Sequence, residues 1–204
     1  MTTFFLVRHA SMDGLGHRIV GRERGVHLNR QGQTEAEYLA SRLRGIPFSA
    51  IYSSPMERAQ DTANAIARVL ESSVSTEAGL NEIDYGNWTG RTFDELDKSA
   101  EWRCYNTCRH TAQIPGGESM PQLLQRAWQT VEHLRKVHGS GVIVLVSHAD
   151  WIRAAAAHYT GASLDVLQKF DVYPASISIL RVNDGEGRVV RWNDTGHDLH
   201  GAVT

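Results

Sequence analysis

The sequence predicts an α/β protein, a three-layer α/β/α sandwich around a mostly parallel sheet. Two short apolar runs, 4–7 and 142–146, have the composition of strands that are buried on both faces. Segments with helical periodicity lie between and around them, at about 30–44 and 119–137. Strands that alternate with helices form parallel sheets covered on both faces. The 204 residues suit one domain, so we expect a single domain over 1–204.

The first half of the chain begins with a strand, a loop and a helix. After the strand at 4–7, the segment 11–26 is rich in Gly and Arg, which predicts a long loop of functional importance. The helix at 30–44 is predicted by apolar residues on one face, with Gly45 at its C-terminal end. A second short strand is expected at 50–52.

The next helix has a clear predicted start. Ser54 is expected to cap it, with Pro55 in its first turn and Glu57 completing a capping box. The side chains expected on its buried face are Met56, Ala59, Ala63, Ile66, Ala67 and Leu70.

The middle of the chain is less regular. We expect a helical and loop insertion at about 86–118 that caps the active site, with one helix from Thr92 to about Tyr105. Ser119 and Gln122 form a second candidate capping box at the start of the helix that ends near Val137.

The last third of the chain completes the sheet. The apolar run 142–146 is the clearest buried strand, and a helix is expected at 151–159, before Gly161. Two closing strands are predicted at 177–182 and 188–192, joined by a turn at 183–185.

Charge and composition exclude several classes of protein. The 21 basic and 23 acidic residues are balanced and scattered, so we expect no nucleic-acid and no membrane partner. Cys104 and Cys108 are too few for a disulfide scaffold, which favours a cytoplasmic location. No signal peptide or membrane span is recognisable. A homodimer is left open.

Two histidines follow the two strongest strands directly. His9 comes after the strand at 4–7, and His148 follows the strand at 142–146. Because ligands bind at the carboxyl ends of parallel strands, we expect both rings at one edge of the sheet. Arg8 precedes His9, and Arg58 lies in the first turn of a helix, where an anion is already favoured.

These residues belong to a set of ordered motifs that resembles the histidine phosphatase superfamily, also called phosphoglycerate-mutase-like. The signature of that family, Leu-Val-Arg-His-Gly, is similar to LVRHA at 6–10. The other matching segments, in chain order, are 28–32 (LNRQG), 52–55 (YSSP) with Arg58, 80–90 (LNEIDYGNWTG), 116–119 (GGES) and 146–148 (VSH).

The resemblance implies a phosphoglycerate-mutase-like fold and a role for each matching residue. His9 is the expected nucleophile, which becomes phosphorylated. Arg8, Arg58 and His148 are expected to bind the phosphoryl oxygens, and Glu82 to donate a proton to the leaving group. Such a site works by positioning and charge stabilisation without a metal or another cofactor. His9 must present a neutral nitrogen, so a backbone carbonyl is expected to accept its other N–H.

The chain departs from the family pattern in places. Ala10 replaces the usual glycine, which restricts φ if that position is left-handed. Leu15 replaces a common asparagine, so the phosphate contact is expected from Ser11, or from Arg18 or Arg22.

Other differences bear on the substrate. Ala149 is expected at the binding site, and the neighbouring Asp150 either lies near the pocket mouth or, as we favour, faces solvent. The basic residues of the first loop (Arg18, Arg22 and Arg24) indicate a second anionic group on the substrate.

The favoured function is hydrolysis of a small phosphate monoester through a phosphohistidine at His9. One alternative is a phosphoglycerate mutase, although the insertion is short for one. Others are a non-catalytic phosphate-binding regulatory module and a metal hydrolase that uses Asp194, His197 and His200, of which we favour neither. The physiological ester, any residual mutase activity and the role of the two cysteines are not readable from the sequence.

Overall fold

The computed structural model describes residues 1–196 and has one six-stranded sheet with the strand order β3-β2-β4-β1-β5-β6. The strands are β1 (Thr2–Arg8), β2 (Ala50–Ser53), β3 (Val74–Thr76), β4 (Val142–Ser147), β5 (Ile177–Asn183) and β6 (Glu186–Asp194). The first four are parallel to one another, whereas β5 and β6 are antiparallel to their neighbours. The mostly parallel sheet is therefore confirmed, and the short strand β3 was not predicted.

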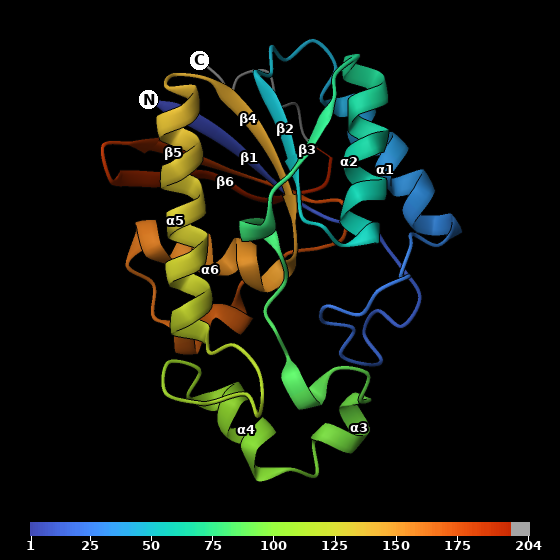
Figure 1. Ribbon diagram of the computed structural model, residues 1–204, viewed down its shortest axis with the longest axis vertical. Coiled ribbons are helices and arrows are strands. Elements are labelled where there is room, and N and C mark those ends of the chain that lie inside the picture. Colours follow the sequence, from blue (N-terminus) through green and yellow to red (C-terminus); the bar gives the residue numbers. More distant parts are fainter. Residues whose placement is uncertain (197–204) are drawn as a thin grey trace.

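Helices cover both faces of this sheet, as predicted (Figure 1). α1 (Arg30–Arg42) and α2 (Glu57–Leu70) pack on one face, and α5 (Met120–His138) and α6 (Ala149–Thr160) pack on the other. The run 4–7 in β1 is apolar throughout because its side chains alternate between two cores. Phe4 and Leu6 join the core under α5 and α6, and Phe5 and Val7 join the core under α1 and α2.

The insertion lies beyond the carboxyl ends of the parallel strands (Figure 1). It contains a short 3-10 helix, η2 (Gly86–Trp88), and two helices, α3 (Phe93–Leu96) and α4 (Ala100–Thr107). The prediction of one helix from Thr92 to Tyr105 was wrong because Ser99 caps a new helix after α3 has ended. Two further 3-10 helices, η1 (Ala78–Leu80) and η3 (Leu164–Lys169), were not predicted.

The insertion is joined to the loop 11–26 by a ladder of backbone hydrogen bonds. Ile19 N donates to Arg91 O over 2.9 Å, and Gly90 N donates to Ile19 O over 2.7 Å. Phe93 N donates to His17 O over 3.1 Å. The two segments that surround the end of the sheet are therefore held to each other.

The predicted helix starts have different outcomes. The capping box of Ser119 and Gln122 is confirmed at the start of α5. The predicted capping by Ser54 and Glu57 was wrong, since α2 begins at Glu57 with Met56 as its N-cap and no side-chain cap. Ser54 contacts His148 instead.

Several expectations concern partners and location. Within residues 1–196, none of the helices has the length and apolar character that crossing a bilayer requires. Both cysteines are free and exposed, and the cytoplasmic location and a homodimer stay predictions. The described part of the chain contains no cluster of three candidate metal ligands, and His197 and His200 lie outside it.

Candidate active site

The two strand-end histidines lie together, as the sequence predicts. β1 and β4 are adjacent parallel strands with Arg8 aligned to Ser147, so the residues that follow them emerge side by side. The ring centroids of His9 and His148 are 5.2 Å apart. A cavity of about 530 Å³ opens at this edge, and His9, Arg8 and Glu82 line it.

His9 has the protonation that a nucleophile needs. Its Nδ1 lies 2.8 Å from the carbonyl oxygen of Ala10, which can only accept, so Nδ1 carries the proton. Nε2 is then an unprotonated nitrogen, and its lone pair points toward Arg58. Burial, and then the positive charges of Arg58 and Arg8, hold the pKa of His9 well below its ordinary value. The predicted carbonyl acceptor is therefore present.

Arg58 connects the two histidines. Its Nε donates to His9 Nε2 over 3.3 Å, and its Nη2 lies 3.2 Å from His148 Nδ1. Nη2 also donates to Gly21 O over 2.7 Å, which holds the guanidinium against the first loop. Two further guanidinium atoms, Arg8 Nε and Arg58 Nη1, are buried and have no acceptor within residues 1–196. Both arginines line the cavity.

His148 is fully buried behind this cavity and does not line it. Since Arg58 only donates, His148 Nδ1 must accept, and Nε2 carries the proton and donates to Ser54 Oγ over 2.8 Å. Burial lowers the pKa of His148 well below its ordinary value, as does the charge of Arg58. The ring is therefore neutral, held between Arg58 and Ser54.

Glu82 lies beside His148 with a perturbed pKa. Its Oε2 lies 3.9 Å from His148 Nδ1, and its Oε1 accepts from Ile83 N over 3.0 Å. Burial, and then the negative charge of Asp150, raises the pKa of Glu82 to about 7. This carboxyl therefore holds a proton near neutral pH that an exposed glutamate has already lost.

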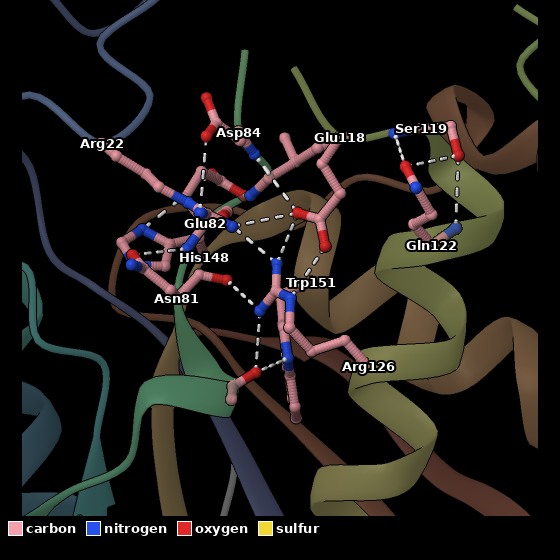
Figure 2. A network of polar contacts seen from close by, with 12 residues as sticks. Arg22, Asn81, Glu82, Asp84, Glu118, Ser119, Gln122, Arg126, His148 and Trp151 are labelled. Carbon is pink, nitrogen blue, oxygen red and sulfur yellow. Dashed lines mark hydrogen bonds and ion pairs between the residues drawn. The ribbon is translucent and has the colours of Figure 1, made fainter. Parts of the chain in front are cut away.

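The loop that carries Glu82 is held between charged side chains, Arg22, Glu118 and Arg126, which form a clamp (Figure 2). Arg126 of α5 donates to the carbonyl oxygens of Gly79, Asn81 and Glu82. It also pairs with Glu118 over 2.8 Å, and Arg22 donates to Glu118 and to the Glu82 carbonyl. The clamp fixes the backbone on both sides of the carboxyl.

Another cluster of charges lies in the wall of the cavity. Asp150 Oδ1 accepts from Arg109 Nη1 (3.2 Å) and from Arg153 Nη1 (3.0 Å), and its Oδ2 accepts from the Tyr85 hydroxyl (2.6 Å). All four side chains line the cavity. The favoured solvent-facing position of Asp150 was therefore wrong, because the first turn of α6 points it inward, where two arginines compensate its charge. The sequence analysis did not identify Arg109, Arg153 or Tyr85.

The other predicted binding residues separate into two groups. Ala149 and Arg18 line the cavity, but Arg18 is already paired with Glu23. Ser11 and Arg22 are not part of its lining. The Ser11 hydroxyl donates to Glu35 over 2.9 Å, and Arg22 pairs with Glu118 in the clamp on the Glu82 loop.

The departures from the family pattern also have outcomes. Leu15 lines the cavity, where it adds apolar surface. Ala10 is not among the described residues with positive φ, so its side chain causes no backbone strain.

Trp102 lines the cavity, whereas Trp88 and Tyr105 are buried in the core. His110 is exposed and pairs with Asp165.

Known proteins are similar to this chain in sequence. The chain is 31% identical over 202 residues to phosphoserine phosphatase 1 of Hydrogenobacter thermophilus, covering 97% of this chain and 94% of that one. It is 28% identical over 198 residues to phosphoglycerate mutase-like protein 4 of Arabidopsis thaliana, covering 94% and 85% of the two chains.

A solved structure agrees with these relatives. A phosphoserine phosphatase mutant of Entamoeba histolytica in complex with phosphoserine superposes with a TM-score of 0.88 at 27% identity, over 97% of this chain and 99% of that one. The model of the histidine phosphatase superfamily (branch 1) matches residues 4–195. With its two strand-end histidines beside Arg8 and the buried Arg58, the chain belongs to the histidine phosphatase superfamily.

Proposed function

We propose that the protein is a phosphatase that hydrolyses a small phosphate monoester through a phosphohistidine at His9. The observation that carries the proposal is a pair of guanidinium nitrogens, Arg8 Nε and Arg58 Nη1, which are buried and have no acceptor in the described residues. Both arginines line the cavity together with His9. Unpaired buried donors are costly, and the oxygens of a phosphoryl group satisfy them with charge-assisted hydrogen bonds.

The chemistry follows from the protonation states. His9 Nε2 attacks phosphorus while the bond to the leaving oxygen breaks, and Glu82 gives its proton to that oxygen. Glu82 is then a carboxylate, so it takes a proton from a water molecule that attacks the phosphohistidine. Inorganic phosphate leaves, and His9 and Glu82 return to their starting states. Arg8 and Arg58 hold the equatorial oxygens, where negative charge accumulates. His148 acts through Arg58, because both of its ring nitrogens are already hydrogen-bonded, to Arg58 and to Ser54.

The same chemistry supports a mutase if the phosphoryl group returns to the product instead of passing to water. The relatives include proteins named for each activity, phosphoserine phosphatase and phosphoglycerate mutase-like. Phosphatase is favoured because the insertion over this cavity is short. Phosphoserine and 3-phosphoglycerate are the first esters to test, since solved relatives bind them.

The decisive experiment measures phosphate release from a panel of phosphate esters in EDTA, with wild-type protein and His9→Ala side by side. His27→Ala is the matched control, because His27 is an exposed histidine that pairs with Asp61 away from the cavity. We expect EDTA-resistant turnover that His9→Ala abolishes and His27→Ala retains. Quenching the wild-type reaction in an alkaline denaturant, which preserves the P–N bond, should trap phosphate on His9.

Other results would reject the proposal. Isomerisation of 3-phosphoglycerate without phosphate release would identify a mutase. Turnover that survives in His9→Ala would remove His9 as the nucleophile. Tight phosphate binding with no turnover of any ester would identify a binding module.

A further inference from the structure

The wall of the cavity holds a buried cation, Arg109, that takes no part in the reaction proposed at His9. Arg109, at the end of the insertion, is 4% exposed, and its guanidinium carbon lies 4.4 Å from the centre of the Tyr105 ring. Its Nη1 donates to Asp150. Its Nε is buried and has no acceptor in the part of the chain that the structure describes.

The charges around Arg109 do not cancel. Arg109 and Arg153 share a single carboxylate, Asp150, which also accepts from the neutral Tyr85 hydroxyl. Arg153 Nε donates a hydrogen bond to Phe170 O over 2.8 Å. The cluster of Arg109, Asp150, Arg153 and Tyr85 therefore keeps one net positive charge in a wall from which water is largely excluded.

This excess charge is separate from that at the phosphoryl end of the cavity. There, Arg8 and Arg58 match the two negative charges of a phosphate monoester, and Glu82 is protonated. Once the phosphoryl group is bound, the wall cluster remains positive and Arg109 Nε remains without an acceptor. Buried cations are stable when paired, so the complete ligand should bring a further anion.

We propose that Arg109, held by Asp150 and Tyr105, forms a subsite for a carboxylate on the leaving group of the substrate. A carboxylate carries one negative charge, which equals the excess of the cluster, and its planar oxygens suit a guanidinium edge. An ammonium group in this position would meet two arginines. The proposal rests on the proposed phosphatase function and assigns the substrate class to carboxylate-bearing phosphate esters.

The first loop does not offer a comparable site, although its basic residues suggested one. Arg18 pairs with Glu23, and Arg22 pairs with Glu118. Arg24 is exposed, with Glu57 at 3.9 Å. The second anionic group that the sequence indicated is therefore assigned to the cluster of Arg109, Asp150, Arg153 and Tyr85.

The test compares two esters that differ only in the carboxylate, phosphoserine and phosphoethanolamine. We expect the wild-type protein to favour phosphoserine in kcat/KM. Arg109→Met keeps the aliphatic stem against Tyr105 and removes the charge, so the preference should fall about 10-fold or more. Asp150→Asn removes the opposite charge and leaves the cluster more positive, so the preference should rise.

Damage to the fold would lower the rates for both esters together. Opposite shifts of the preference in Arg109→Met and Asp150→Asn would therefore show that the cluster recognises the carboxylate. The matched control is Arg103→Met, which removes an exposed arginine of α4 and should leave the ratio unchanged. The proposal is overturned if wild type shows no preference, or if Arg109→Met and Asp150→Asn both leave it as it was. If Arg109→Met does not fold, the direction of change in Asp150→Asn decides.

Failure of the proposed function is distinguished by binding. Calorimetry on His9→Ala measures the affinities for phosphoserine and phosphoethanolamine without turnover. A preference that Arg109→Met removes there supports the carboxylate subsite even if neither ester is hydrolysed. Equal affinities would reject the subsite, whether or not the protein is a phosphatase.

Discussion

Glu82 and the buried Asp150 are two carboxyl groups of one cavity that are held in opposite protonation states. Burial and the charge of Asp150 raise the pKa of Glu82 to about 7. The pKa of Asp150 is lowered despite its burial, because Arg109 and Arg153 stabilise the carboxylate and Tyr85 donates to it. Environments that separate the pKa values of neighbouring carboxyls assign them different roles, here a proton donor and a fixed anion.

The pH dependence of the reaction follows from this pair. Glu82 donates its proton during cleavage, so kcat/KM should fall as the pH rises through about 7. Asp150→Asn removes a negative charge, which lowers the pKa of Glu82 and moves this falling limb to lower pH. The measurement is the pH profile of kcat/KM for both proteins. Glu82→Gln should lose the limb together with most activity, and a limb that moves upward in Asp150→Asn would contradict the pairing.

Ser54 is expected to orient His148. Ser54→Ala removes the acceptor of the Nε2 proton, so the ring loses its fixed orientation and kcat should fall about 5-fold, the effect of one hydrogen bond. Ser53→Ala removes an adjacent buried hydroxyl that donates to Ser54 O, so it serves as the control. Steady-state kinetics on both variants check the prediction. Equal effects would show that Ser54 acts only on local packing.

Arg126 is expected to act on catalysis through the Glu82 loop. Arg126→Met removes one donor from each of three carbonyl groups and leaves Arg22 as the ion-pair partner of Glu118, so unfolding should become easier by about 2 kcal/mol. Because the freed loop no longer holds the carboxyl, kcat should fall as well. Arg135→Met on the same helix is the control, since Arg135 pairs with Glu132 and Asp184, away from the Glu82 loop. Denaturant melts and kcat, measured together, check both effects.

Gly32 allows α1 to pack against the first loop. A Cβ atom there would lie 1.9 Å from the carbonyl oxygen of Ser11, which is backbone and cannot rotate away. Gly32→Ala should therefore cost about 3 kcal/mol of stability. Chemical denaturation measures this cost, with the exposed neighbour variant Gln33→Ala as the control. A cost no larger than that of Gln33→Ala would mean that the loop adjusts freely.

The sequence predicts the catalytic end of the cavity well because that end depends on strands. An apolar run of only four or five residues is typical of a strand buried on both faces, and the residue after such a strand lies at the sheet edge. His9 and His148 were located in this way. Arg58 was located because helices that follow strands begin at the same edge.

The cluster of Arg109 and Asp150 in the cavity wall was not predictable by the same reasoning. Arg109 follows α4 in the irregular part of the chain and meets Asp150 across 41 residues of sequence. No periodicity encodes a contact of that range. Ser54 was misassigned for a related reason, since a serine before a helix satisfies the pattern of a cap and only the tertiary structure shows His148 as its partner.

The backbone ladder between residues 17–19 and 90–93 has a consequence for how such an enzyme changes its substrate over evolutionary time. An insertion or deletion in either segment would shift the register of the other, so changes of loop length are penalised twice. Point substitutions on the inner surface meet no such penalty. Divergence to new esters should therefore proceed by exchange of single side chains, with the length of both segments preserved.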